Sequence, residues 1–91
     1  NHNDVNSKQR RTLENLTENP IRSDIDWDDV VSLLKSFGVE VTAGRGSRIR
    51  FCYNGRAAFL HRPHPENELK RYQVVAIRDF LIETGIIQED L

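Results

Sequence analysis

The dipeptide Asn54-Gly55 is the feature that most restricts what this chain can fold into. Asn-Gly between alternating segments is the strongest short-range signal for a two-residue β-hairpin turn. In the preceding residues 48–53, every second side chain points to the same face of a strand. Ile49, Phe51 and Tyr53 therefore share one face, and the two arginines share the other. Residues 56–61 return as the next strand, and residues 39–43 form an earlier strand that ends at a glycine-rich turn. The sequence therefore predicts a three-stranded antiparallel meander.

An amphipathic helix is predicted on each side of this meander in the chain. Residues 27–37 place apolar side chains at helical spacing, with Asp24 or Asp26 as the N-cap and Gly38 as the residue that ends the helix. The acidic residues at this start are interpreted as helix caps rather than metal ligands, because consecutive helical positions point in different directions. Residues 71–84 form the second helix. Two helices on one face of the sheet would bury all the apolar stripes.

A weaker helical segment precedes these elements at residues 6–17. Ser7 can cap it, and Leu13 with Leu16 gives it only a narrow apolar edge. We therefore expect this helix to pack peripherally, after a frayed tail that ends before Asn6.

The order of these elements predicts an α+β fold. It is α-β-β-β-α with a three-stranded antiparallel sheet and an extra N-terminal helix. Residues 1–23 are expected to form an N-terminal extension and residues 24–91 the main domain. The predicted core consists of Trp27, Val30, Leu34, Phe37, Ile49, Phe51, Phe59, Val74, Ile77 and Leu81.

Charge is balanced over the whole chain but segregated along it. The formal net charge is -1, from 13 Lys and Arg against 14 Asp and Glu. Between Gly44 and Arg71, however, basic residues outnumber acidic ones, which is typical of a surface that binds a polyanion such as RNA. A solvated, arginine-rich hairpin is the alternative. The charged residues of this block are Arg45, Arg48, Arg50, Arg56, Arg62, Lys70 and Arg71 against Glu66 and Glu68.

The composition excludes several classes of protein. Cys52 is the only cysteine, so an intrachain disulfide and a cysteine-rich zinc site are both excluded. The apolar stretches are far shorter than the roughly 20 residues that cross a bilayer, and the N-terminus lacks an apolar secretory core. The turn at residues 44–47 is too short for a dinucleotide fingerprint and has no P-loop lysine. We therefore expect a cytoplasmic protein that needs no membrane, cofactor or metal.

His61 and His64 are the only obvious acid–base candidates within the basic block. No acidic residue lies between them, which argues against a metal site. A histidine can move a proton to or from a ribose 2′-hydroxyl near neutral pH. The alternative is that each histidine only hydrogen-bonds a loop carbonyl beside a proline.

Four short motifs follow one another along the chain. They are Phe37-Gly38 at the end of a helix, Gly44-Arg45-Gly46-Ser47 leading into an arginine-bearing strand, a proline/histidine loop, and Glu68-Leu69-Lys70 before the last helix. Together they resemble the HicA toxins of type II toxin–antitoxin modules, over about residues 24–87. The resemblance implies a small fold like that of double-stranded-RNA-binding domains for residues 24–91. It also implies metal-independent endoribonuclease activity on mRNA, that of an mRNA interferase, and neutralisation by a HicB-like antitoxin.

The chain departs from this family where the usual catalytic histidine stands. HicA toxins carry that histidine directly after the Gly-Ser turn, whereas this chain reads Gly46-Ser47-Arg48-Ile49. His64 matches a second family histidine, which stands a few residues ahead of a Lys-Glu-Leu-Lys-like segment. Two interpretations stay open. Either Arg48 stabilises a phosphorane while His61 or His64 acts as the base, or the domain binds RNA and its partner with weakened cleavage.

The implied fold reads A-form RNA through its shape and its phosphates. An acidic antitoxin that covers the same cationic face would fit this charge pattern. A structural or assembly domain that uses its apolar surface is a third interpretation, and the sequence indicates no oligomeric state. The residues predicted to bind RNA are Arg45, Arg48, Arg50, Arg56, Lys70 and Arg71.

Overall fold

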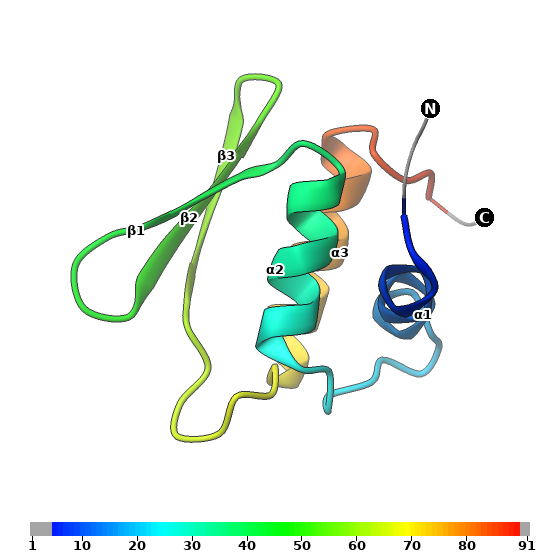
Figure 1. The fold of residues 1–91 in the computed structure, drawn as a ribbon, viewed down its shortest axis with the longest axis horizontal. Helices are drawn as coiled ribbons and strands as arrows, with labels where there is room; N and C mark the ends of the chain where they lie inside the picture. The colour runs from blue at the N-terminus through cyan, green and yellow to red at the C-terminus, as the bar shows by residue number, and fades with distance from the viewer. Residues whose placement is uncertain (1–4, 90–91) are drawn as a thin grey trace.

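The computed structural model describes residues 5–89, in which three helices and one three-stranded sheet follow the predicted order (Figure 1). The helices are α1 (Ser7–Leu16), α2 (Trp27–Ser36) and α3 (Arg71–Glu83), and the strands are β1 (Glu40–Ala43), β2 (Arg48–Tyr53) and β3 (Arg56–His61). The predicted α+β class is confirmed, with the α-β-β-β-α order of a double-stranded-RNA-binding-domain-like fold after an extra helix. None of the helices within residues 5–89 has the length and apolar character needed to cross a membrane.

The sheet is an antiparallel meander in the order β1-β2-β3. Its tight turn is made by Asn54 and Gly55, whose φ angles of 54° and 81° are the positive values that a two-residue hairpin turn needs. Phe51, in the middle of β2, is only 1% exposed, and the side chains that alternate with it point to the opposite face. The helices cover the face of Phe51 and leave the other face uncovered (Figure 1).

α2 and α3 both lie on the covered side of the sheet (Figure 1). The Asp26 side chain accepts a hydrogen bond from the backbone N–H of Asp29 at 3.2 Å, which confirms an acidic N-cap for α2. The ring of Phe51 packs against those of Trp27 and Phe80, at centroid separations of 6.0 and 6.1 Å. These aromatic contacts tie the two helices to the centre of β2.

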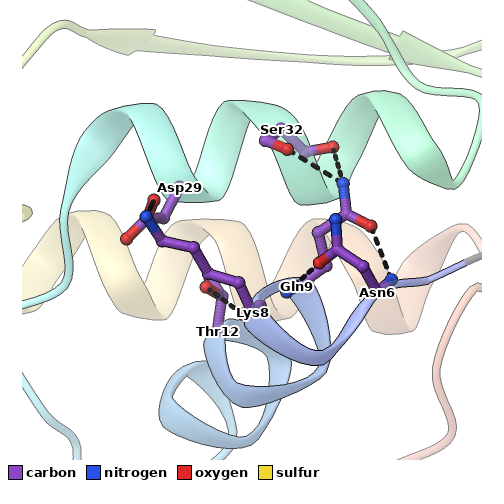
Figure 2. A pocket seen from close by; sticks show the side chains of 6 residues that line it. All are labelled: Asn6, Lys8, Gln9, Thr12, Asp29 and Ser32. Atoms are coloured by element: carbon purple, nitrogen blue, oxygen red, sulfur yellow. Dashed lines mark hydrogen bonds and ion pairs between the residues drawn. The ribbon is translucent and has the colours of Figure 1, made fainter.

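The N-cap of α1 differs from the predicted one. The side chain of Asn6 accepts a hydrogen bond from the backbone N–H of Gln9 at 2.8 Å, and the Gln9 side chain accepts one from the Asn6 backbone at 3.0 Å (Figure 2). This reciprocal pair is a capping box, and it places Ser7, the predicted cap, inside the helix. Asn and Ser are about equally good caps, so only the pairing with Gln9 distinguishes the two positions.

α1 packs on the side of the helix pair that faces away from the sheet, so the fold has three layers (Figure 1). Gln9 Nε2 donates a hydrogen bond to Ser32 Oγ of α2 at 2.9 Å, and Lys8 forms an ion pair with Asp29 at 3.3 Å (Figure 2). Leu16 is fully buried in the core. The expectation of peripheral packing was wrong, because a narrow apolar edge is sufficient when one leucine inserts completely.

The N-terminal part of the chain carries two further predictions. The frayed tail expected before Asn6 lies outside the described residues, apart from Val5, which is partly buried against the core. The division into an extension of residues 1–23 and a domain of residues 24–91 stays a prediction.

Most of the predicted core is confirmed, and one member of it is wrong. Phe37 and Ile49 are partly buried against the core, but Phe59 is 51% exposed. Residues 57–60 are all apolar, so alternation alone cannot show which neighbours face inward. The register buries Leu60 instead and turns Phe59 to the uncovered face. The confirmed core residues are Trp27, Val30, Leu34, Phe51, Val74, Ile77 and Leu81.

Candidate functional site

The uncovered face of the sheet gathers cationic, aromatic and imidazole side chains. Residues directly opposite each other on antiparallel strands share a face. The register of β2 and β3 pairs Arg48 with His61 and Arg50 with Phe59. These four residues, the outer-face cluster, therefore lie together on the surface that no helix covers. All four are exposed, so a ligand can reach them without a change in the fold.

His61 is oriented by the turn that precedes β2. Its Nδ1 lies 3.2 Å from Ser47 Oγ, within hydrogen-bonding distance. The backbone N–H of Arg62 donates to the carbonyl of Ser47 at 2.7 Å, which holds this turn against the end of β3. No hydrogen bond joins His61 Nε2 to any residue within 5–89, so this nitrogen is the one left for a ligand.

The arginines of the cluster keep their charge unpaired. The Arg48 guanidinium carbon lies 4.7 Å from the centroid of the Phe59 ring, a cation–π distance. Arg50 Nη2 donates to Cys52 Sγ at 3.7 Å, a weak contact. In the described part of the chain, neither arginine has a carboxylate within ion-pair distance. Their positive charge is therefore available to an anionic ligand.

Gln73 connects the cluster to α3. Its side chain is 1% exposed, donates to the backbone carbonyl of His61 at 2.8 Å and accepts from the backbone N–H of Lys70 at 2.8 Å. A buried polar group needs such partners, because burial without them is costly. Gln73 thus fixes the end of β3 against the start of α3.

The other predicted site residues lie apart from the cluster. Arg56 pairs with Tyr53, so the register places it on the helix-covered face at the far end of the hairpin. His64 is exposed on the loop after β3, where its backbone carbonyl accepts a hydrogen bond from Lys70 Nζ at 3.3 Å. Arg71 is exposed as the first residue of α3. Of the predicted residues, the sheet thus brings together Arg48, Arg50 and His61.

Arg45 joins this group at the edge of the sheet. It lines an open hollow together with Arg48, Arg50 and Phe59, beside the end of β1. A second hollow, lined by Arg48, Phe59, Leu60 and His61, lies on the other side of the Arg48–Phe59 pair. The hollow between α1 and α2 is different, because its polar side chains already bond to one another (Figure 2).

No metal site competes with this interpretation in the part of the chain that is described. Residues 5–89 contain no group of three His, Cys, Asp or Glu side chains close enough to hold a metal ion. The acidic residues near the start of α2 serve as caps and hydrogen-bond acceptors: Asn67 Nδ2 donates to Asp26 Oδ1 at 3.3 Å and to Asp28 Oδ2 at 3.0 Å.

Three members of the site, Phe59, Gln73 and Ser47, are not among the predicted site residues, and the sequence carries a signal for the first two. A two-residue turn at Asn54-Gly55 fixes the pairing of β2 with β3, so the Arg48–His61 pair can be counted outward from it. The same count places Phe59 beside the arginines. Gln73 stands three residues after the N-cap of α3, which is half of a capping-box signal; the other half is missing because the N-cap is Lys70, whose ammonium group cannot accept a hydrogen bond. Ser47 has no comparable signal, since its contact with His61 depends on the conformation of the turn.

One comparison with known proteins identifies a family. The model of the HicA_toxin family, described as HicA toxin of bacterial toxin-antitoxin, matches residues 27–86. The match runs from the first residue of α2 to just beyond the end of α3 and includes the whole outer-face cluster. Neither the curated proteins nor the solved structures yielded a match.

Proposed function

Because this chain belongs to the HicA family of toxins of bacterial toxin–antitoxin systems, we propose that it binds mRNA on the uncovered face of its sheet and cleaves it there. The observation that carries the proposal is the outer-face cluster, in which an imidazole stands opposite an arginine that has no carboxylate partner within residues 5–89. A HicB-like antitoxin is the proposed partner that neutralises this type II toxin.

In the proposed reaction, His61 is the general base. Its Nε2 takes the proton of a ribose 2′-hydroxyl, and the 2′-oxygen attacks the adjacent phosphorus. The bond from phosphorus to the 5′-oxygen of the next nucleotide breaks, and that oxygen leaves with a proton from water. The products are a 2′,3′-cyclic phosphate and a 5′-hydroxyl. No oxidant, reductant or metal is needed to balance this transesterification.

Arg48 is the proposed stabiliser of the transition state. It stands on the strand beside β3, directly opposite His61 in the register. A fixed guanidinium stabilises the negative charge that develops on a pentacovalent phosphorus. This role would allow an arginine to occupy the place after the Gly-Ser turn where the resemblance implies a histidine. The leaving 5′-oxygen takes its proton from water in this proposal, because His64 lies apart from the outer-face cluster, on the loop that follows β3.

Binding of the RNA backbone is assigned to the arginines. Arg45 and Arg50 line one hollow with Arg48, and we expect them to contact successive phosphates. Arg56, Lys70 and Arg71 are proposed contacts for RNA that extends beyond the uncovered face. Each phosphate contact adds to the salt dependence of binding, because it releases counterions.

The experiment that tests this proposal is cleavage of a defined RNA by the purified protein in EDTA, which removes metal-dependent contaminants. We expect fragments that end in a 2′,3′-cyclic phosphate. A matched RNA with 2′-deoxyribose at the cleaved position should stay intact, because it lacks the nucleophile. Adding the companion antitoxin should stop the reaction, and induced expression without it should arrest growth. An RNA that is bound but never cleaved would contradict the catalytic part.

A second candidate function is a binding module of the same fold without catalysis. The observation that favours it is Arg48 itself, which stands where the family resemblance implies the catalytic histidine. This candidate predicts RNA binding that weakens with salt and with Arg48→Ala or Arg50→Ala, but no cleavage. The two candidates therefore differ in one readout, the appearance of the cyclic phosphate.

A further inference from the structure

Phe59 is an unusual residue to leave uncovered. It is 51% exposed, and among the described residues the only other large hydrophobic side chain that exposed is Tyr72. The register fixes Phe59 opposite Arg50, on the face that no helix covers. The neighbouring strand β2 supplies Arg48, Arg50 and Cys52 to this face, and β1 beyond it supplies Glu40 and Thr42. The ring is therefore available to a ligand that has both an apolar flat surface and negative charge.

The Arg48–Phe59 pair also separates two hollows. One hollow continues toward Arg45 and Arg50, and the other continues toward His61. Both members of the pair line both hollows. A chain molecule that crosses the face would have to pass over the guanidinium and the ring, with the imidazole on one side and two further arginines on the other.

We propose that Phe59 and Arg48 form a stacking platform for an unpaired nucleobase, so that the site takes single-stranded RNA and not duplex. This inference rests on the proposed RNA-binding function and names the substrate class of the same site. Every base offers a flat π-face to an aromatic ring or a guanidinium plane, whatever its identity. In an A-form duplex these faces are covered by neighbouring bases, and only the backbone and the groove edges are accessible.

The geometry assigns a different part of the nucleotide to each group. The base stacks on Phe59 and Arg48, its flanking phosphate contacts Arg45 or Arg50, and the ribose on the other side meets His61 Nε2. Phe59 thus positions the scissile linkage without taking part in proton transfer. A duplex could reach the arginines, but it could not place a base on the ring.

The test is the affinity of the full chain for one oligonucleotide in two forms. The probe is a fluorescein-labelled 12-nucleotide 2′-O-methyl RNA of mixed sequence, single-stranded or annealed to its complement. The 2′-O-methyl groups prevent cleavage by 2′-oxygen attack. Fluorescence anisotropy at fixed salt should give tighter binding to the single strand. Phe59→Leu, which keeps an apolar side chain without a flat ring, should weaken single-strand binding roughly 5- to 100-fold and leave duplex binding unchanged.

Three variants serve as controls in the same assay. Phe59→Tyr should restore single-strand binding, because it restores the ring, and Tyr72→Ala should bind like the wild type. Arg50→Gln should weaken both forms and flatten the salt dependence, whereas Phe59→Leu should keep the slope. Circular dichroism would establish that each variant is folded.

The outcomes separate this inference from the function it rests on. Wild-type protein that binds single strand and duplex equally, or Phe59→Leu that binds the single strand as tightly as wild type, overturns the stacking platform but not RNA binding. Wild-type protein that binds neither form overturns both. Tighter binding to the duplex would favour the A-form recognition implied by the fold.

Discussion

Replacing Gln73 by leucine should destabilise the fold and disturb the site at the same time. The change keeps a good helix former of similar size, so it removes two 2.8 Å hydrogen bonds without opening a large cavity. Each bond whose buried partner is left unsatisfied costs about 1–3 kcal/mol. Because His61 and Lys70 are themselves exposed, water can partly replace the amide. We therefore expect a total loss of about 2–3 kcal/mol in the free energy of unfolding.

The effect is large enough to measure by thermal unfolding. For a chain of this size, 1 kcal/mol shifts Tm by roughly 4–8 °C, so the variant should melt roughly 8–24 °C below the wild type. Arg71→Leu is the matched control, because it places the same side chain on an exposed position of α3 and should change the free energy by less than about 0.5 kcal/mol. A Gln73→Leu protein with the wild-type Tm would show that this side chain does not hold β3 against α3.

Other parts of the fold give further predictions. Leu16→Ala should lower the free energy of unfolding in urea by about 2–5 kcal/mol, and Leu13→Ala, at a partly buried position, should lower it clearly less. Equal small losses for both variants would mean that α1 is peripheral. Gly38→Ala should cost about 1–2 kcal/mol, since φ is 92° there, and an unchanged urea midpoint would contradict this. A hydrogen bond from Arg22 lowers the pKa of Asp24 below its ordinary 3.8. Asp24→Asn should therefore slightly lower the free energy of unfolding at neutral pH. The difference in stability from the wild type should vanish as the pH falls through the lowered pKa of Asp24, and a difference that persists in acid would contradict this assignment.

Local signals in the sequence predict the parts of the fold that local chemistry determines. Asn54 and Gly55 need positive φ only because two strands must reverse there, and both adopt it. Gly38 follows the end of α2 with φ at 92°, the left-handed conformation in which many helices end and which glycine adopts most easily. The amphipathic stripes of α2 and α3 favour both helices on one face of the sheet, because that arrangement buries both stripes against the apolar face of β2.

The errors arise where tertiary context decides between local alternatives. Ser7 and Asn6 are both acceptable caps, and only the contact with Gln9 selects Asn6. Leu16 looks like part of a weak helix until the far side of α2 and α3 is in place. Phe59 lies in a run of apolar residues, so the sequence does not show which of them face the core. The register of the strands buries Leu60 and exposes Phe59.

The candidate site was predictable in type, and its arrangement was predictable only as far as the Asn54-Gly55 turn determines the register of β2 and β3. Charge segregation indicates a cationic hairpin, and residue chemistry points to His61 and His64 as proton carriers. Which histidine stands beside Arg48 depends on strand pairing, and the register selects His61. Gln73 acts through hydrogen bonds to backbone atoms that the sequence does not locate.

Single-turnover cleavage of one RNA in EDTA by His61→Ala, His64→Ala and the wild type tests the proposed active site directly. We expect His61→Ala to lower the cleavage rate by about 100- to 10,000-fold, the usual contribution of a general base, with RNA affinity and Tm unchanged. We expect a smaller loss of cleavage rate for His64→Ala. Cleavage at the wild-type rate by His61→Ala, or a loss confined to His64→Ala, would contradict the assignment of the uncovered face of the sheet as the active site.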